Sequence, residues 1–222
     1  MVLGLRRRRR ESQPDPAGAA KAPAEHFDTH LLALLFEQHP QGAPLRVLDV
    51  GPAAGETVAF LSQYRCRLHY ADLYDEPSLL GACEPDEHRE RTRRFQVLLG
   101  ESLEEPYDVC LFWDLFRYIH ASALPALGEA LAPMVRQGTL AHAFLCHGRT
   151  PAGQAPLGAR CFGIASATRV SYRFCPHEEL SAYNLPQREV IDQVGCFEVD
   201  KSRLLQGGLL EVLLSADNVL PL

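Results

Sequence analysis

The sequence predicts an α/β fold in which a mostly parallel β-sheet carries helices on both faces and ends in a C-terminal antiparallel hairpin. Between residues 45 and 146, short apolar runs alternate with helix-like segments, which is typical of right-handed crossovers onto a parallel sheet. The runs are almost continuously apolar, as expected of strands covered on both faces. The last two runs are separated by a short turn at Gly207-Gly208, so their strands must be antiparallel. At 222 residues with 46% hydrophobic content, the chain is expected to form one domain.

The N-terminal residues 1–24 are expected to form a disordered basic tail. An arginine run at 6–10 is followed there by proline, glycine and alanine without an amphipathic period. The domain then extends over residues 25–222. A helix at 26–38 is expected to cover one edge of the fold, because four apolar residues recur at helical spacing, namely Phe27, Leu31, Leu34 and Leu35.

Seven strands and four further helices follow in order. The strands are expected at 45–50, 67–72, 95–99, 107–113, 139–146, 197–205 and 209–214, and the helices at 56–64, within 77–92, at 122–132 and at 186–194. The strand at 95–99 rests on the alternation of Phe95, Val97 and Leu99 before Gly100, although the arginines before it also suit a helix that continues to Leu99. Residues 147–176 show no clean period and are expected to form a lid or an acceptor-binding segment.

The loop after the first apolar run has the composition of a cofactor seat (residues 49–55). The small residues Gly51, Ala53 and Gly55 let the backbone approach a ligand closely, and a helix is expected to begin just beyond them. Asp72 closes the second apolar run twenty-one residues after Gly51, a distance that suits an acid binding ribose hydroxyls.

These residues resemble motifs of the class I S-adenosylmethionine-dependent methyltransferases, whose Rossmann-like sheet has seven strands and ends in an antiparallel hairpin. The segment 49–55 resembles the family's Asp-x-Gly-x-Gly-x-Gly loop, and Asp72 matches its ribose-binding acid. The resemblance implies that Gly100-Glu101 reaches the adenine and that 107–115, including Asp114, faces the methionine portion and the acceptor. The cofactor-binding residues implied are therefore Asp49, Gly51, Ala53, Gly55, Asp72, Glu101 and Asp114.

The sequence departs from the family pattern at three places. Ala53 replaces the middle glycine, which would strain the loop if that position needs a positive φ. Glu101 replaces the usual aspartate, and residues 133–138 match the family's Pro-Gly-Gly only loosely. A nicotinamide dinucleotide is the alternative ligand, but its fingerprint needs a glycine where Glu56 stands, and a carboxylate would repel a pyrophosphate.

Asp114 and His147 are the candidate catalytic bases, because both follow strands at the edge where open parallel sheets bind ligands. Asp114 could instead cap a short helix, and His147 could be a solvated loop residue. His120 and His142 are weaker candidates, and His142 is expected to be a satisfied core residue. Four ring-bearing residues could shape an acceptor pocket or serve in ordinary packing, namely Tyr172, Phe174, His177 and Tyr183.

The charge balance favours a small-molecule acceptor over nucleic acid. Removing the five tail arginines from 22 basic residues leaves 17 against 28 acidic ones, so the body repels phosphate. No apolar run is long enough to span a bilayer, and the cysteine pattern suggests reduced thiols, so a cytoplasmic protein is expected. A zinc site around Cys161, Cys175 and His177 matches no usual ligand spacing. The alternative to an enzyme is a catalytically inactive, methyltransferase-like binding or scaffold protein.

Overall fold

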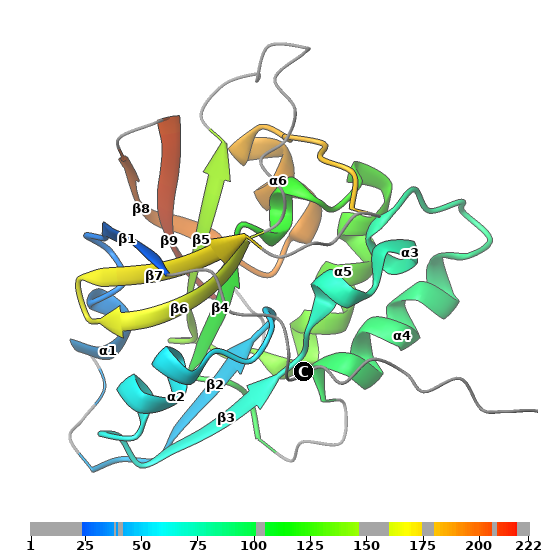
Figure 1. The fold of residues 1–222 in the computed structure, drawn as a ribbon. Helices are drawn as coiled ribbons and strands as arrows, with labels where there is room; N and C mark the ends of the chain where they lie inside the picture. Colours follow the sequence, from blue (N-terminus) through cyan, green and yellow to red (C-terminus); the bar gives the residue numbers. More distant parts are fainter. Residues whose placement is uncertain are drawn as a thin grey trace, which may run out of the picture.

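A computed structural model of the chain describes residues 24–37, 39, 42–100, 105–146, 160–174, 180–205 and 208–216 (Figure 1). The expected basic tail, except for its last residue, lies outside these ranges, as do Glu101, His147 and Gly207.

The main sheet confirms an α/β fold with a mostly parallel core. Its described strands are β2 (Leu45–Asp49), β3 (Cys66–Tyr70), β4 (Val109–Trp113), β5 (Leu140–Cys146), β8 (Glu198–Leu204) and β9 (Leu209–Ser215). They lie in the order β3-β2-β4-β5-β9-β8. The strands β2 to β5 pair in parallel, whereas β9 is antiparallel to both β5 and β8.

Helices cover both faces of this sheet. They are α1 (Leu34–Glu37), α2 (Gly55–Leu61), α3 (Pro77–Leu80), α4 (His88–Leu99), α5 (Leu124–Leu131) and α6 (Gln187–Val194). Successive strand residues point to opposite faces, so Leu111 and Trp113 of β4 join a core with α1 and α2, whereas Cys110 and Phe112 join a core with α4, α5 and α6. The buried strands are apolar on both sides for this reason.

The expected strand at 95–99 is wrong, because these residues form the last part of helix α4. Arg91, Phe95 and Leu99 recur at helical spacing and are all buried. Val97 is 64% exposed, so the apparent alternation did not reflect a sheet face. Gly100 ends the helix in the left-handed conformation at φ 93°. The main sheet therefore has six strands in the described residues, and β3 pairs there only with β2.

A second, three-stranded antiparallel sheet replaces part of the expected helix at 26–38. It consists of β1 (Glu25–Asp28), β7 (Arg169–Phe174) and β6 (Arg160–Ser166), in the order β1-β7-β6. Phe27 packs against Phe144 and Tyr172 at centroid distances of 5.3 and 5.8 Å, so tertiary contacts hold the segment extended. Of the described residues in this segment, only Leu34–Glu37 are α-helical. In the segment 147–176, which the sequence left without a period, residues 160–174 form paired strands.

Helices α5 and α6 approach each other closely at Gly128. A Cβ atom there would lie 2.0 Å from the carbonyl oxygen of Val194. We expect Gly128→Ala to lower the free energy of unfolding by about 3 kcal/mol, because backbone must move to admit the methyl group. Urea denaturation measures the effect, and Gly81→Ala is the control, since its Cβ would lie an ordinary 3.4 Å from the nearest atom. Equal stability of the two variants would contradict this packing.

The described residues also bear on the cysteines, on metal binding and on membrane-spanning helices. Cys66, Cys83, Cys110 and Cys196 are free thiols, in agreement with the expected pattern of reduced cysteines, whereas Cys161 is disulfide-bonded and departs from it. Among the described residues, no group of three or more metal-ligating side chains is close enough to hold an ion. None of the described helices combines the length and apolarity needed to cross a membrane.

Candidate functional site

The candidate site lies at the carboxyl end of strand β2, which has β3 on one side and β4 on the other. From the central strand β2 the chain first adds β3 on one side and then crosses over to add β4 on the other. Such a switch point leaves a crevice at the carboxyl ends of the strands, where open α/β sheets bind ligands. Backbone hydrogen bonds from Ala71 to Asp49 (2.8 Å) and from Val50 to Leu111 (3.1 Å) hold these ends together. The structure thus brings together the expected site residues that end or follow β2, β3 and β4.

Asp49 is a fully buried carboxyl group at the end of β2. Its Oδ1 accepts hydrogen bonds from Gly51 N at 2.9 Å and from Trp113 Nε1 at 2.6 Å. Its Oδ2 is buried and has no hydrogen-bond partner within the described ranges. Burial raises the pKa of Asp49 to about 7, the two hydrogen bonds oppose this rise, and the nearby charge of Asp72 adds to it. The site therefore holds an acid that lacks a cationic or donor partner at one oxygen.

The small residues of the cofactor seat differ in their surroundings. Neither Gly51, Ala53 nor Gly55 has a positive φ, so alanine replaces the family's glycine without backbone strain. Ala53 and Gly55 are exposed, and a Cβ atom at Gly55 would meet no atom within 4 Å. Gly51 is buried, and a Cβ atom there would lie 3.0 Å from the indole of Trp113. A glycine is therefore needed at position 51 because the side chain of Trp113 packs closely against its backbone.

Asp72 lies directly after β3 and is half-buried. Its Oδ1 accepts a hydrogen bond at 3.2 Å from the backbone N–H of Tyr74, so Asp72 caps the short helical turn η2 (Leu73–Asp75). The charge of Asp72 contributes to the raised pKa of Asp49, so the two carboxyl groups share one electrostatic environment. Its contact with a ribose stays a prediction.

Asp114 follows β4 and is 3% exposed. Tyr74 Oη donates a hydrogen bond of 2.9 Å to its Oδ1. Burial raises the pKa of Asp114 to about 6, while this hydrogen bond and the charges of Arg160 and Arg117 oppose the rise. Asp114 occupies the cap position of the turn η3 (Leu115–Arg117), but its side chain does not cap it. A carboxyl group with a pKa near neutrality suits a general base.

Two arginines accompany Asp114 that sequence reasoning did not single out. The guanidinium carbon of Arg160 lies 5.0 Å from the ring centroid of Tyr172, and that of Arg117 lies 6.0 Å from the ring of Tyr118. Within the part of the chain that is described, neither arginine forms an ion pair. These cations therefore line the surroundings of Asp114 without being neutralised at contact distance.

The histidines and aromatic residues expected near an acceptor separate into different places. His142 is a core residue with Nε2 2.9 Å from Glu211 Oε1, but its buried Nδ1 has no hydrogen-bond partner among the described residues, so the expectation of a satisfied histidine is met only in part. His120 accepts a hydrogen bond from Ser122 N, and its ring packs against Tyr183 at 4.9 Å. Tyr172 and Phe174 lie together at 5.9 Å on β7, and His147 and His177 lie outside the described residues.

Of the expected adenine contact at Gly100-Glu101, only Gly100 is described, because Glu101 lies outside the described residues. The Tyr107 hydroxyl donates a 2.6 Å hydrogen bond to the carbonyl oxygen of Leu99, and Tyr107 precedes β4. Gly100 therefore lies at the amino end of β4, whereas Asp114 lies at its carboxyl end. Residues 95–99 form a helix that runs back along the sheet, so Gly100 lies at the amino edge of the strands. Open α/β sheets bind their ligands at the carboxyl edge.

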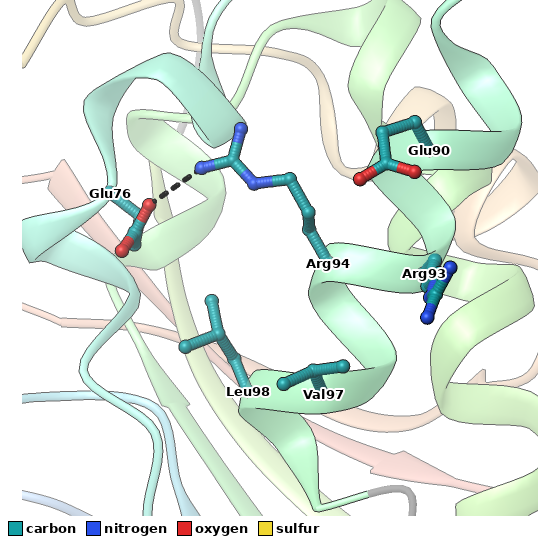
Figure 2. Close-up of a pocket in the computed structure, with 6 residues that line it drawn as sticks. All are labelled: Glu76, Glu90, Arg93, Arg94, Val97 and Leu98. Carbon is teal, nitrogen blue, oxygen red and sulfur yellow. Dashed lines mark hydrogen bonds and ion pairs between the residues drawn. The ribbon is translucent and has the colours of Figure 1, made fainter.

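A pocket of about 490 Å³ lies against helix α4 (Figure 2). Figure 2 shows Arg94 reaching across it to Glu76, with which it forms a 2.9 Å ion pair, above Val97 and Leu98. His69 of β3 contacts the Leu98 carbonyl oxygen at 2.9 Å, so the helix is anchored to the strand. The pocket is separate from the carboxyl groups of the candidate site.

The structure adds Trp113, Tyr74, Arg117 and Arg160 to the site. Two weak signals preceded them in the sequence, since Tyr74 stands two residues after Asp72 and Trp113 stands beside Asp114. Arg160 carried no signal, because its strand belongs to a segment without a period.

No protein-family model matches the sequence, and no curated protein is detectably similar to it. Solved structures with a similar arrangement include a 1,6-didemethyltoxoflavin-N1-methyltransferase from Burkholderia thailandensis with bound S-adenosylhomocysteine (TM-score 0.44, 17% identity, 84% of this chain and 76% of that chain covered). An N-methyltransferase from Bradyrhizobium japonicum has a TM-score of 0.44 at 13% identity, covering 79% of this chain and 87% of that one. A magnesium protoporphyrin IX methyltransferase from Synechocystis with bound S-adenosylmethionine has a TM-score of 0.43 at 10% identity, covering 83% and 76%.

Similarity at these TM-scores and identities does not by itself carry an inference about activity. The strand order and the position of the site rest on this chain's own geometry. With six strands in the described part of its main sheet in place of seven, the chain resembles the class I S-adenosylmethionine-dependent methyltransferases in the loop after its first parallel strand and in the acid after its second.

Proposed function

We propose that the chain binds S-adenosylmethionine at the carboxyl ends of β2, β3 and β4 and transfers its methyl group to a small-molecule acceptor. The supporting observation is the set of three carboxyl groups at this edge: Asp49, Asp72 and Asp114. Such an edge attracts cations and repels phosphate. A ligand with an ammonium group, a sulfonium and ribose hydroxyls, but no phosphate, matches it better than a dinucleotide does.

The described residues divide the proposed binding among themselves. The unpartnered Oδ2 of Asp49 suits an ammonium donor, and the half-buried Asp72 suits the ribose hydroxyls. Gly51, Ala53 and Gly55 keep the adjoining backbone free of bulky side chains of their own. The contact of Glu101 with the adenine stays a prediction, and Gly100 before it lies at the opposite edge of the sheet.

The bound cofactor would supply a methyl group already activated by the positive sulfur, so the protein mainly has to orient the acceptor and exclude water. An Oδ atom of Asp114 would accept the proton that a hydroxyl or amine acceptor loses. Arg117 and Arg160 would offset the negative charge around it. His147 is the second proposed base.

The alternative is a methyltransferase-like protein that does not catalyse transfer. It is favoured by the indole of Trp113, which packs against Gly51. Calorimetry with S-adenosylmethionine, followed by a labelled-methyl assay on fractionated cell extract, separates the two proposals. Transfer of label supports the enzyme, binding without transfer supports the alternative, and absence of binding at millimolar cofactor contradicts the enzyme.

Replacing Asp72 by alanine is expected to weaken cofactor binding by about tenfold to a hundredfold, because hydrogen bonds to a charged group are lost. Isothermal titration calorimetry measures the effect. Asp72→Asn is the matched variant, since it keeps an acceptor for Tyr74 N and so separates loss of the turn from loss of the ligand contact. Asp86→Ala, at an exposed aspartate, is the control. Unchanged affinity in Asp72→Ala would show that the ribose contact is misplaced.

A further inference from the structure

The indole of Trp113 fills the space beside Gly51. It is 1% exposed, its Nε1 donates the 2.6 Å hydrogen bond to Asp49, and its Cδ1 would be 3.0 Å from a Cβ atom at Gly51. A ligand that uses the bare backbone of Gly51 and the Oδ1 atom of Asp49 therefore competes with this ring for both, whereas the ring leaves Oδ2 of Asp49 without a hydrogen bond. Trp113 thus contacts both features that predict the cofactor seat, namely the bare backbone of Gly51 and the carboxyl group of Asp49.

The second sheet holds the ring from its other side. Phe162 of β6 stacks on Trp113 with a centroid distance of 5.4 Å and an interplanar angle of 9°. Figure 1 shows the β6–β7 pair, in yellow, beside α2. The aromatic stack thus connects the end of β4 to an element outside the main sheet.

The β6–β7 pair is fastened to the cofactor seat as well. A Cβ atom at Gly163 would lie 3.2 Å from the Cβ atoms of both Ala54 and Glu56, so the strand runs directly against the loop. Ile164 N donates a 3.1 Å hydrogen bond to Thr57 Oγ1, and Arg173 forms an ion pair with Glu56. Movement of this strand pair would release Phe162 from Trp113.

The backbone of Trp113 is in an unfavourable conformation. Its φ is 51°, and in the described residues the only other residue besides glycine with a positive φ is Asn184. A bulky residue in this region costs on the order of 1–3 kcal/mol and persists only where its surroundings hold it. The pairing of β4 with β5 also shifts register between Leu111 and Trp113. Local strain therefore favours an alternative position of this residue once its contacts are released.

We propose that Trp113 is a gate on the cofactor seat: in the ligand-free protein its indole occupies the space beside Gly51, and ligand binding displaces it together with the Phe162 stack. This inference rests on the proposed function, since it describes how that site opens. When the gate is closed, Asp49 accepts a hydrogen bond from a neutral indole. When it is open, both oxygens of Asp49, and not Oδ2 alone, are available to the ammonium group of the ligand, a stronger partner for a carboxylate.

The chain contains a single tryptophan, so its fluorescence reports on the gate directly. The full-length protein is titrated with S-adenosylhomocysteine while calorimetry measures binding and acrylamide quenching measures the exposure of Trp113. The gate predicts emission typical of a buried indole without ligand, then a red shift and stronger quenching on saturation. Binding with unchanged emission and quenching would overturn the gate while leaving the proposed function standing.

Two variants test the gate independently of fluorescence. If the open form makes up a tenth or less of the ligand-free population, Trp113→Ala should bind S-adenosylhomocysteine about tenfold tighter or more. Trp113→Phe keeps a ring for Phe162 but loses the hydrogen bond to Asp49, so it should show a smaller gain in affinity and decides the question if the alanine variant does not fold. Phe95→Leu, at a buried ring in α4, is the control and should bind like the parent protein.

The variants also separate the gate from the function. Binding by the variants but not by the parent supports a gate that is closed at rest. Binding by parent and variants with equal affinity overturns the gate alone, and absence of binding in all of them overturns both the gate and the proposed cofactor.

Discussion

Glu211→Ala is expected to lower the free energy of unfolding by about 3–5 kcal/mol, the cost of removing one partner from a buried charged network. Glu211 is fully buried on β9. Its Oε1 accepts from Leu31 N at 3.0 Å and lies 2.9 Å from His142 Nε2, while its Oε2 accepts from His30 N at 2.9 Å. Alanine would leave two backbone donors and one imidazole nitrogen buried without partners.

The same carboxylate explains how the segment before α1 is held to the main sheet. Burial by itself would raise the pKa of Glu211, but the hydrogen bond and attraction of His142 and the two backbone donors lower it below 4.5 overall. Because the folded pKa is depressed, the contribution is complete above 4.5 and is lost as the pH falls through the folded value. The difference in stability between parent and Glu211→Ala should therefore shrink in acid.

Urea denaturation at pH 7 and at pH 3 measures both effects. Glu211→Gln retains an acceptor for one backbone donor and should lie between parent and alanine variant. Glu90→Ala, on the exposed face of α4, should change stability by less than about 0.5 kcal/mol. If Glu211→Ala is as stable as Glu90→Ala, the network does not hold the fold.

Asp49→Asn is expected to remove a pH dependence of stability and, at the same time, to abolish tight cofactor binding. Burial raises the pKa of Asp49 from 3.8 to about 7. Its contribution to the stability of the folded protein is therefore fully present below pH 3.8, where the carboxyl group is protonated, and is lost as the pH rises through 7. The parent should therefore lose on the order of 2–4 kcal/mol between pH 4 and pH 8 through this residue. An amide has no such transition.

The comparison is made as the difference in unfolding free energy between the two proteins at several pH values. The parent should lose stability relative to Asp49→Asn as the pH rises, whereas exposed Asp86→Asn should track the parent. Binding of S-adenosylhomocysteine to Asp49→Asn should weaken by about 2–3 kcal/mol, because an amide replaces a charged acceptor. A flat difference across this pH range would mean that Asp49 is solvated in the folded protein.

The two outcomes together would identify Asp49 as a residue kept at a cost to stability. A carboxyl group buried with one unpartnered oxygen destabilises the folded protein near neutral pH. Such a cost is common at binding sites, where a ligand supplies the missing partner.

Particular segments show where sequence reasoning succeeded and where it failed. The strands β2, β4 and β5 were predictable because burial on both faces makes them continuous apolar runs. Helix α6 was predictable from its period, and it begins and ends as expected near 186–194. Residues 95–99 failed because Phe95 and Leu99 satisfy both a two-residue and a four-residue repeat, and only packing against the sheet decides between them.

The second sheet could not be predicted for a related reason. The strand β1 has four residues, three of them exposed, and its partner β7 lies more than a hundred residues away. Neither strand carries a period strong enough to be recognised locally, because each gains its stability from the other.

By itself, the amino-acid sequence determined the parallel strands, the small-residue loop after the first of them and the acids at the strand ends, since each depends on composition within a few neighbouring residues. The tertiary structure alone decided that Trp113 lies against Gly51, that Asp49 is left with one unpartnered oxygen and that Gly100 lies at the opposite edge. Those facts depend on which side chains from β4, β6 and α4 reach the same point in space, and contacts between distant segments leave no local pattern in the chain.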